Sequence, residues 1–258
     1  LAKAILDAAG WWGRRWVRYH MVEISPRLRQ VQAAVLEGRK VTWHDALAHA
    51  LDAADRPVVV SNELVDAFPC KLLRYEKGAW RELRLVWPPV GDPELTAHDL
   101  DLDLAPFTAC DPLMWPGGIP AGQVVEILPA FRDWLAGWAD RAKGVEVLTI
   151  DYGDTMPDLY RDRPRGTLRG YLAHQRLTGA ALFRGPGTMD LTADVNFTDL
   201  QAWGQSHGLR TVALTDQAGF LDDWMPEKEK ARHAEDLARI ADPAGAGAAF
   251  KVLWQSGN

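Results

Sequence analysis

This chain has few cysteines, no long apolar run and no excess of basic residues. Cys70 and Cys110 are its only cysteines, and their spacing does not fit a zinc site. Such a low cysteine content suits a reducing compartment, and no stretch approaches the roughly 18 apolar residues that a membrane span needs. The net charge is -6, whereas a nucleic-acid-binding surface needs a basic excess. We therefore expect no structural metal, no membrane span and no nucleic-acid partner.

The chain also lacks a glycine-rich dinucleotide loop and an initiating methionine. Its first residue is Leu1, and residues 1–10 already have the apolar spacing of a helix that stops at Gly10. Because a chain rarely begins inside a helix, we expect that a segment preceding Leu1 is absent from this sequence. No segment resembles a signal peptide.

What is present is the composition of a globular protein, with 47% hydrophobic and 25% charged residues. The length suits one large α/β domain, or a domain that carries an insertion. Residues 18–23, 40–43 and 58–61 have the pattern of short strands, and Ser25 with Pro26 begins a helix between the first two. That helix places four apolar side chains on one face, namely Leu28, Val31, Val35 and Leu36. Strands that alternate with helices in this way are typical of a doubly wound sheet.

The middle and the end of the chain are less regular. Residues 71–75 and 80–87 are expected to pair as a hairpin around Lys77 and Gly78. Stretches rich in proline and glycine then indicate an insertion or lid over about 70–122, and a long polar loop is expected over about 154–190. Strands are predicted at 123–127, 145–153, 209–214 and 250–254, and helices at 196–207 and 227–240.

Four of the predicted strands are followed by an acid, and these acids are Glu23, Asp45, Glu63 and Asp151. Because ligands bind at the carboxyl ends of strands in open α/β sheets, the four acids are expected to line one rim. An acid in the position of Glu23 can hold both hydroxyls of a ribose. Asp45, beside the small Ala46, can accept from an adenine amino group. The alternative is that Glu23 is a surface acid beside Arg27.

The segment from Ser61 to Pro69 places three polar side chains where the third strand ends. Asn62, Glu63 and Asp66 together can grip a cofactor amine or a cationic substrate. The alternative is a strand end at which the Asn and Asp side chains only cap a turn. Asp151 and Tyr152 are expected to form the floor of a site, or Asp151 caps the turn that follows it.

Two further patterns bear on metal and cofactor. Alternating oxygen-bearing residues resemble the start of a calcium loop, namely Asp190, Thr192, Asp194 and Asn196. They lack the central glycine and the later bidentate acid of such a loop, so we interpret them as an N-cap cluster for the next helix. A nicotinamide-dependent enzyme would need a Gly-x-Gly-x-x-Gly loop before Glu23. That alternative stays open only if such a loop lies upstream of Leu1.

The order of the motifs along the chain resembles that of one known family. The motifs are Met21–Arg29, Ser61–Pro69, Ile150–Gly153, Thr167–Tyr171 with His174, Asp190–Phe197 and Phe250–Val252. In this order they resemble the MidA-like family of S-adenosylmethionine-dependent methyltransferases over nearly the whole chain. Mitochondrial members of that family assist the assembly of respiratory complex I by dimethylating an arginine. The chain departs from the family pattern at Leu64, Val65 and Phe68, where two aromatics and a leucine are usual.

The resemblance implies a class I methyltransferase fold, which is α/β and Rossmann-like. The expected sheet is seven-stranded, mostly parallel and flanked by helices, with a family-specific insertion. A single methyltransferase domain is expected over residues 1–258. The resemblance also implies that the first strand and the glycine-rich cofactor loop lie before Leu1, so this sequence on its own lacks part of the cofactor site.

The resemblance further implies a protein methyltransferase that uses S-adenosylmethionine and modifies an arginine. The cofactor would be held by Glu23, Ile24, Asp45, Ala46 and Asn62. Glu63 and Asp66 would hold the substrate guanidinium, and His174 would also touch the substrate. Catalysis is assigned to Glu63, Asp66 and Asn62, because a carboxylate can bind a guanidinium bidentately, orient one nitrogen and help its proton leave.

The implied partner is a protein substrate, such as a subunit of respiratory complex I. Two alternatives stay open: a non-catalytic assembly factor that keeps the fold, and a methyltransferase that acts on a different substrate. The composition, without a targeting segment in view, fits the cytoplasm of a bacterium, or the mitochondrial matrix if the protein is eukaryotic.

Overall fold

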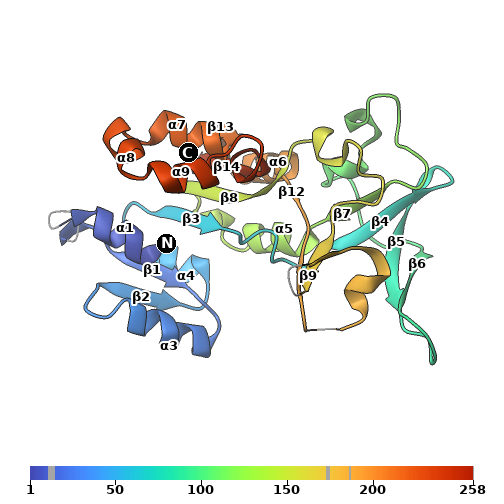
Figure 1. Cartoon of the computed structure of the whole chain (residues 1–258), viewed down its shortest axis with the longest axis horizontal. Coiled ribbons are helices and arrows are strands. Elements are labelled where there is room, and N and C mark those ends of the chain that lie inside the picture. Colours follow the sequence, from blue (N-terminus) through green and yellow to red (C-terminus); the bar gives the residue numbers. More distant parts are fainter. Residues whose placement is uncertain (11–14, 173–174, 186, 258) are drawn as a thin grey trace. The chain divides into compact units, whose positions relative to one another are not determined.

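The computed structural model describes residues 1–10, 15–172, 175–185 and 187–257. Within these ranges the chain divides into two compact units, and each is described on its own (Figure 1). Unit 1 comprises Leu1–Pro57 and Gly137–Arg141, and unit 2 comprises Val58–Ala136 and Ala142–Asn258.

Unit 1 contains a two-stranded parallel sheet with helices. Its elements include α1 (Ala2–Ala8), β1 (Tyr19–Val22), α3 (Pro26–Val35), β2 (Val41–His44), α4 (Leu47–Asp52) and the 3₁₀ turn η3 (Ala139–Arg141). α3 begins where the sequence predicts, because the Ser25 side chain accepts from the Leu28 N–H and Pro26 fills the first helical position. The path from β1 through α3 to the parallel β2 is the predicted strand–helix–strand order.

The predicted apolar face of α3 is mostly exposed within unit 1. Three of its side chains are about half exposed, namely Leu28 (50%), Val31 (56%) and Val35 (55%), and only Leu36 is buried. The helix contacts the strands through an adjacent, polar side, since Arg29 and Gln32 hydrogen-bond to residues in and just after β1 and β2. The spacing therefore predicts the helix correctly but not the face that it turns toward the strands.

The largest sheet of unit 2 has five strands, which are β3 (Val58–Asn62), β8 (Glu146–Asp154), β12 (Val195–Asn196), β13 (Leu209–Asp216) and β14 (Phe250–Gly257). β3 and β12 pair with β8 in parallel, whereas β14 runs antiparallel to both β8 and β13 (Figure 1). The sheet is therefore mixed rather than mostly parallel, because β13 and β14 form an antiparallel pair. Among the described residues, seven strands in a single sheet are not found.

The helices of unit 2 are α5 (Pro129–Ala136), α6 (Phe197–Ser206), α7 (Gln217–Trp224), α8 (Glu227–Arg232), α9 (Ala234–Ile240) and α10 (Ala246–Ala249). The single helix predicted over 227–240 is two helices, since His233 leaves the helical conformation at φ -115° and ψ 27°. α6 begins after Asn196, whose side chain accepts from the N–H groups of Thr198 and Asp199. This contact confirms the N-cap interpretation of Asn196.

A second sheet of unit 2 is antiparallel and contains β4 (Lys71–Glu76), β5 (Ala79–Val86), β6 (Glu94–His98) and β7 (Val124–Ile127). β4 and β5 form the predicted hairpin. Lys77 and Gly78 at its tip have the positive φ angles, 53° and 82°, that a two-residue hairpin turn favours. Two 3₁₀ turns, η1 (Thr108–Cys110) and η2 (Pro112–Met114), follow β6. Whether the region 70–122 is an insertion or a lid stays a prediction.

The segment expected to be a long loop over 154–190 is more ordered than predicted. It contains the 3₁₀ turns η4 (Asp158–Tyr160) and η5 (Gly179–Phe183), and the strands β9 (Arg169–Leu172) and β10 (Gln175–Leu177), which pair with each other; β9 also pairs with β11 (Asp190–Thr192). The buried Glu126 of β7 fixes the approach to β9, because its carboxylate accepts from the N–H groups of Thr167 at 2.8 Å and Leu168 at 3.0 Å. Such a contact leaves no periodic signal in the segment itself, so the pattern missed it.

The core of unit 2 is built around β8 and the elements near it. Buried side chains from β8, β14 and α6 include Val147, Leu253 and Phe197. Along β8 the burial alternates, so that Val147, Thr149 and Asp151 all lie on a buried face. Of the helices in the described ranges, none has the length and apolarity that crossing a bilayer requires.

Candidate functional site

In unit 1 the chain places Glu23 directly after β1, beside the end of β2. The Glu23 N–H donates to the carbonyl oxygen of His44 at 3.1 Å. One carboxylate oxygen accepts from the Ser25 N–H at 2.8 Å, and the other accepts from the Gln32 side-chain amide at 2.9 Å. Each carboxylate oxygen can accept about two hydrogen bonds, so both keep an acceptor position. This geometry fits the predicted contact with two ribose hydroxyls.

The other cofactor residues predicted in unit 1 lie at the same edge of its sheet. The Asp45 carboxylate, whose side chain is 77% exposed, pairs with the Arg29 guanidinium at 2.5 Å. Arg29 also donates from Nε to the Glu23 carbonyl oxygen at 2.6 Å, so it ties the ends of β1 and β2 together. Ala46 caps the N-terminus of α4, and Ile24 is 80% exposed. Asp45 is thus already neutralised by a cation of its own unit.

In unit 2 Asn62 ends β3, and Glu63 follows it with a positive φ of 51°. The Glu63 N–H donates to the Ile150 carbonyl oxygen of β8 at 2.9 Å, which holds a backbone conformation that side-chain-bearing residues rarely adopt. The Glu63 carboxylate accepts from the Asn62 amide at 3.1 Å and from the Tyr152 hydroxyl at 2.8 Å. Asn62 and Glu63 are both exposed, so the pair is fixed and open to ligands.

Asp66 lies in the turn after Glu63, and its carboxylate accepts from the Thr192 hydroxyl at 2.9 Å. The turn is held by Asp151, whose Oδ2 accepts from the N–H groups of Val65 at 2.9 Å and Asp66 at 3.3 Å. Burial, and to a lesser degree the Asp66 carboxylate, raises the pKa of the Asp151 carboxyl to about 7. The prediction that Asp151 follows its strand and lines a rim is wrong, because β8 continues to Asp154 and buries it. Asp151 does cap a turn, but it is the turn after Glu63 and not, as the alternative has it, the turn that follows Asp151.

Among the described residues, the Glu63 and Asp66 carboxylates have only neutral side-chain hydrogen-bond donors. Glu63 accepts from an amide and a hydroxyl, and Asp66 accepts from a hydroxyl. In the part of the chain that the structure describes, neither carboxylate has an arginine, lysine or histidine nitrogen within ion-pairing distance. Asp194 differs, since it pairs with both Arg163 and Arg169. The Glu63–Asp66 pair is therefore suited to a cation that comes from outside.

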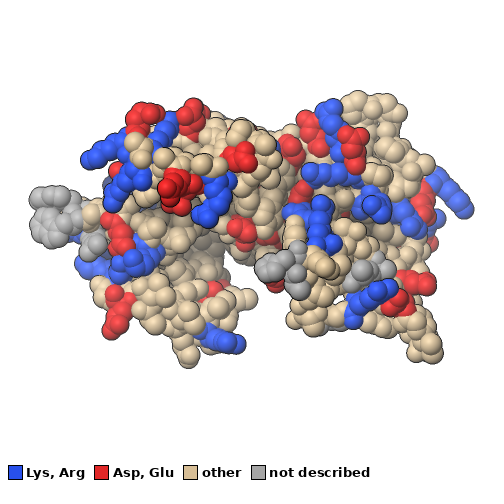
Figure 2. Space-filling view, viewed as in Figure 1, with Lys and Arg blue, Asp and Glu red and all other residues tan. Residues whose placement is uncertain are grey.

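Several remaining predictions meet a mixed outcome. His174 lies outside the described residues. Thr192 bonds to Asp66 while Asp194 bonds to arginines, so these side chains do not converge on one point. No group of three potential metal ligands occurs in the ranges that the structure covers. Acidic and basic side chains are interspersed on the face shown in Figure 2, and the lack of a nucleic-acid partner stays a prediction.

Neither cysteine is suited to nucleophilic chemistry. Burial raises the pKa of both thiols, Cys70 and Cys110, to about 12. The thiolate form that a nucleophile requires is therefore scarce near neutral pH.

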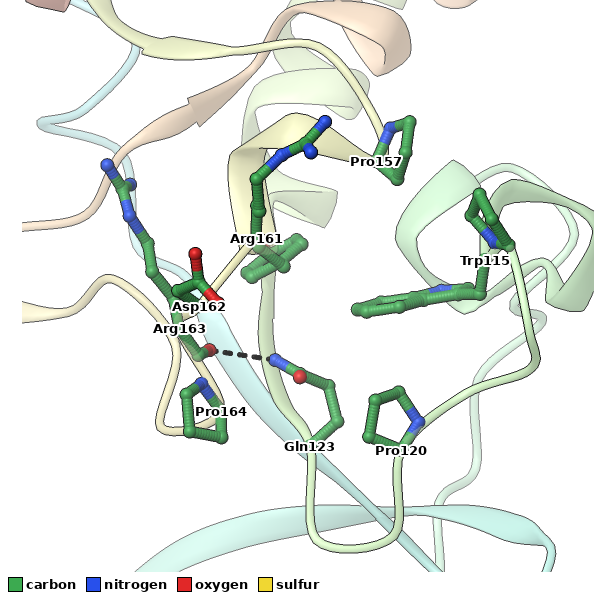
Figure 3. Close-up of a pocket in the computed structure, with 10 residues that line it drawn as sticks. Trp115, Pro120, Gln123, Pro157, Arg161, Asp162, Arg163 and Pro164 are labelled. Atoms are coloured by element: carbon green, nitrogen blue, oxygen red, sulfur yellow. Dashed lines mark hydrogen bonds between the residues drawn. The ribbon is translucent and has the colours of Figure 1, made fainter.

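A separate pocket of about 420 Å³ lies in unit 2, between segments 115–123 and 157–164 (Figure 3). Its lining is largely apolar, with Trp115 and four prolines. The Gln123 side chain joins the two segments by donating to the Arg163 carbonyl oxygen at 2.9 Å. None of the residues predicted for the site lines this pocket. We therefore centre the candidate site on the ends of the strands.

Residues 2–215 match the model of a family described as "putative S-adenosyl-L-methionine-dependent methyltransferase". The chain belongs to this family. Its membership confirms the predicted resemblance to S-adenosylmethionine-dependent methyltransferases and, with it, the cofactor of the family.

Two curated relatives cover most of this chain but less than half of their own length. The chain is 26% identical over 206 residues to "Protein arginine methyltransferase NDUFAF7, mitochondrial" of Xenopus laevis, and 25% identical over 210 residues to the protein of the same name in Danio rerio. The alignments cover 70% and 73% of this chain, but only 43% and 46% of the relatives.

Two crystal structures from Burkholderia thailandensis have a similar fold. One, with S-adenosyl-homocysteine bound, has a TM-score of 0.78 at 24% identity and covers 99% of this chain and 68% of its own. The other, of an uncharacterised protein, has a TM-score of 0.72 at 25% identity and covers 93% of this chain and 66% of its own. The chain therefore has the α/β fold of these structures, whereas the missing first strand and the insertion stay predictions.

Sequence reasoning missed how the unit 2 site is completed. Tyr152 contacts Glu63 across 89 residues of sequence, and Thr192 contacts Asp66 across 126. Local patterns cannot reveal contacts at such separations. The available signal was the ordered set of motifs, because both partners lie in segments that carry the family resemblance.

Proposed function

We propose that this protein is an S-adenosylmethionine-dependent methyltransferase that methylates an arginine side chain of a partner protein. The observation that carries the proposal is the pair of accessible carboxylates, Glu63 and Asp66, each held by neutral donors and without a cationic partner among the described residues. A guanidinium supplies both the charge and the parallel N–H donors that such a pair lacks.

When bound, S-adenosylmethionine supplies the electrophilic methyl group. Glu23 has an acceptor position on each carboxylate oxygen for the ribose hydroxyls. Asp45 and Ala46 would face the adenine, and the exposed apolar side chain of Ile24 suits a ring face. Asn62 would contact the methionine part of the cofactor. The donor and acceptor chemistry of these residues fits the group.

Glu63 and Asp66 carry the substrate side of the proposal. A carboxylate binds a guanidinium through two parallel N–H bonds, which turns a nitrogen toward the methyl donor. A guanidinium is protonated near neutral pH, so methylation of its nitrogen requires the loss of one proton. An adjacent carboxylate stabilises the approach of the cation and can accept that proton before water takes it. The exposure of Glu63 leaves this exit open.

The relatives support the class of substrate, since the curated ones are named as mitochondrial protein arginine methyltransferases. We extend the proposal to a protein partner, such as a subunit of respiratory complex I, met in the mitochondrial matrix or in the bacterial cytoplasm. His174 stays a proposed substrate contact. The family model reaches residues of both units, which supports one methyltransferase domain over 1–258. We keep 70–122 as its proposed insertion or lid.

The proposal is tested by incubating the full-length protein with methyl-labelled S-adenosylmethionine and a peptide that has one central arginine between glycines. We expect the label on the arginine, read as methylarginine by mass spectrometry, and none on a matched peptide that has lysine instead. Label on lysine or on a small molecule would indicate a different substrate. If no acceptor is labelled and calorimetric titration with the cofactor releases no heat, a non-catalytic assembly factor would be favoured.

A further inference from the structure

The Tyr152 side chain is held on three sides at the base of the Glu63 carboxylate. Its hydroxyl donates to Glu63 Oε2 at 2.8 Å. Burial and the hydrogen bond to Glu63 raise the pKa of Tyr152 above its ordinary value, so the hydroxyl keeps its proton and acts as a donor. The Phe250 ring packs edge-on against the Tyr152 ring at 4.7 Å between centroids, and the Arg169 guanidinium carbon lies 5.4 Å from the centre of the same ring.

Arg169 is itself fixed, and its bonds lead away from Glu63. Its side chain is only 12% exposed and pairs with Asp194. The same guanidinium donates to the Thr167 carbonyl oxygen at 3.3 Å and to the Tyr171 hydroxyl at 3.3 Å. Arg169 therefore contacts the ring of Tyr152 without neutralising the carboxylate to which the Tyr152 hydroxyl is bonded.

The frame that holds Arg169 is anchored in the buried interior. Thr167 donates its hydroxyl to Glu126 at 3.1 Å and accepts from the Asp194 N–H at 2.9 Å. Glu126 is 4% exposed, so this anchor is sheltered from water. Asp194 takes a second arginine, Arg163, on its other oxygen. A cation held in this way costs more to displace than one on a mobile surface loop.

We propose that Tyr152 is a positioning residue for methyl transfer, and that Arg169 locks its ring. The hydroxyl fixes the direction of the Glu63 carboxylate, while the pairing of Arg169 with Asp194 keeps a cation of the protein itself from occupying Glu63. This inference rests on the proposed function, because it assigns Glu63 to the substrate guanidinium. It adds that the pairing of Arg169 with Asp194 leaves the Glu63 carboxylate available to the substrate guanidinium.

A merely structural role for Tyr152 predicts something different. Tyr152→Phe keeps the ring, and with it the contacts with Phe250 and Arg169, and removes only the bond to Glu63. We expect kcat for the arginine peptide to fall about 10- to 100-fold, because misplacing a reacting group by about 1 Å costs about that much. The cofactor dissociation constant and the melting temperature should stay near those of the wild type. Tyr75→Phe, in the β4–β5 hairpin where Tyr75 packs on Trp80, is the matched control.

The decisive readout is a double-mutant cycle on peptide binding. Fluorescence anisotropy with a fluorescein-labelled single-arginine peptide, in the presence of S-adenosyl-homocysteine, compares Tyr152→Phe in the wild-type and Glu63→Gln backgrounds. If Tyr152 acts through Glu63, its loss weakens binding about 10-fold in the first background and less than about 2-fold in the second. An equal loss in both backgrounds overturns the inference.

Arg169 is tested by graded replacement. Arg169→Lys keeps a cation over the Tyr152 ring and should retain about one third of the activity, whereas Arg169→Ala should lose about as much as Tyr152→Phe. Arg161→Ala is the control, since Arg161 pairs with Asp158 on the surface. If the wild type methylates the peptide and these variants match it, the positioning inference fails alone. If the wild type binds cofactor but methylates no arginine peptide, the proposed function fails and takes the inference with it.

Discussion

Asp45 of unit 1 and Glu63 of unit 2 both follow a strand, but they differ in the groups that surround them. Asp45 of unit 1 is paired with Arg29, and Arg29 also bonds to the backbone of Glu23. Among the described residues, Glu63 of unit 2 has only a neutral amide and a neutral hydroxyl as side-chain donors, although Arg169 lies over the ring of the tyrosine that supplies the hydroxyl. The same pattern of an acid after a strand therefore gives one acid already neutralised and one left for a ligand.

A third acid shows that strand length decides the outcome as much as sequence position. Asp151 has the same apparent setting as Glu63, but β8 continues past it to Asp154. It is consequently fully buried, and its carboxyl serves the backbone of the turn that carries Asp66. An acid that follows an apolar strand can therefore lie at the strand end (Glu63), in an ion pair (Asp45) or in the interior (Asp151). Only contacts with residues distant in sequence distinguish the three settings.

The largest expected effect in unit 1 follows from removing the Glu23 carboxylate. Glu23→Ala deletes both acceptors proposed for the ribose, each a charge-assisted bond, so we expect cofactor affinity to fall about 100-fold. Isothermal titration with S-adenosylmethionine measures this, with Glu37→Ala, an exposed acid of the same unit, as the control. An unchanged affinity would contradict the assignment of unit 1 to the cofactor.

Asp151→Asn should lower the free energy of unfolding by about 1–3 kcal/mol at pH 5, because an amide cannot accept every N–H that the carboxyl now accepts. The folded pKa near 7 lies above the ordinary value of 3.8, so the folded state binds this proton more tightly than the unfolded chain. That stabilisation is complete below about pH 4 and is lost as the pH rises through 7. Urea unfolding at several pH values should show the gap between wild type and variant narrowing from pH 5 to pH 8, whereas a constant gap would refute the buried-acid account.

Local chemistry predicted the elements that depend on neighbouring residues. Ser25 with Pro26 begins α3, Lys77 with Gly78 turns the β4–β5 hairpin, and Asn196 caps α6. Each of these depends on backbone geometry that one or two residues impose. The motif order then predicted the family, which composition alone does not distinguish from other α/β proteins.

The remainder could not be predicted because it depends on contacts across the chain. β9 is fixed through Glu126 of β7, about 40 residues earlier, and nothing in the 154–190 segment encodes that bond. The amphipathic spacing of α3 gives no sign that its polar residues bond to the ends of the strands. Tyr152 beside Glu63 likewise becomes visible only when β3 and β8 are paired.

A smaller effect on methylation of the arginine peptide is expected for Asp66→Asn, which compares Asp66 with Glu63 in unit 2. The amide oxygen can still accept from the Thr192 hydroxyl, so the turn should persist while one negative charge is lost. We expect KM for the arginine peptide to rise about 10-fold and kcat to change less than about 3-fold. Steady-state kinetics decides, with Asp92→Asn, which sits in a surface ion pair, as the control. A fall in kcat with an unchanged KM would indicate that Asp66 acts in the chemical step and not in substrate binding.

The smallest effect is expected for Asp45→Asn. The Asp45 side chain is 77% exposed and its charge is already paired with Arg29, so it should add less than about 1 kcal/mol to the binding of a ligand. Cofactor affinity should therefore fall only about 3-fold, and added salt should shrink the difference further. Titrations at low and high ionic strength measure it. A loss of cofactor affinity as large as that expected for Glu23→Ala would contradict the view that Arg29 already neutralises Asp45.

In the proposed function Glu63 holds the cationic substrate and not the cofactor. One pair of measurements on Glu63→Gln tests it directly: methyl transfer to the single-arginine peptide, and calorimetric titration with S-adenosylmethionine. Glu94→Gln, an exposed acid at the start of β6, is the matched control. The account predicts a loss of about 100-fold or more in kcat/KM with a cofactor dissociation constant within about 2-fold of the wild type. Turnover close to that of the wild type, or a loss of cofactor binding that alone explains the loss of turnover, would contradict it.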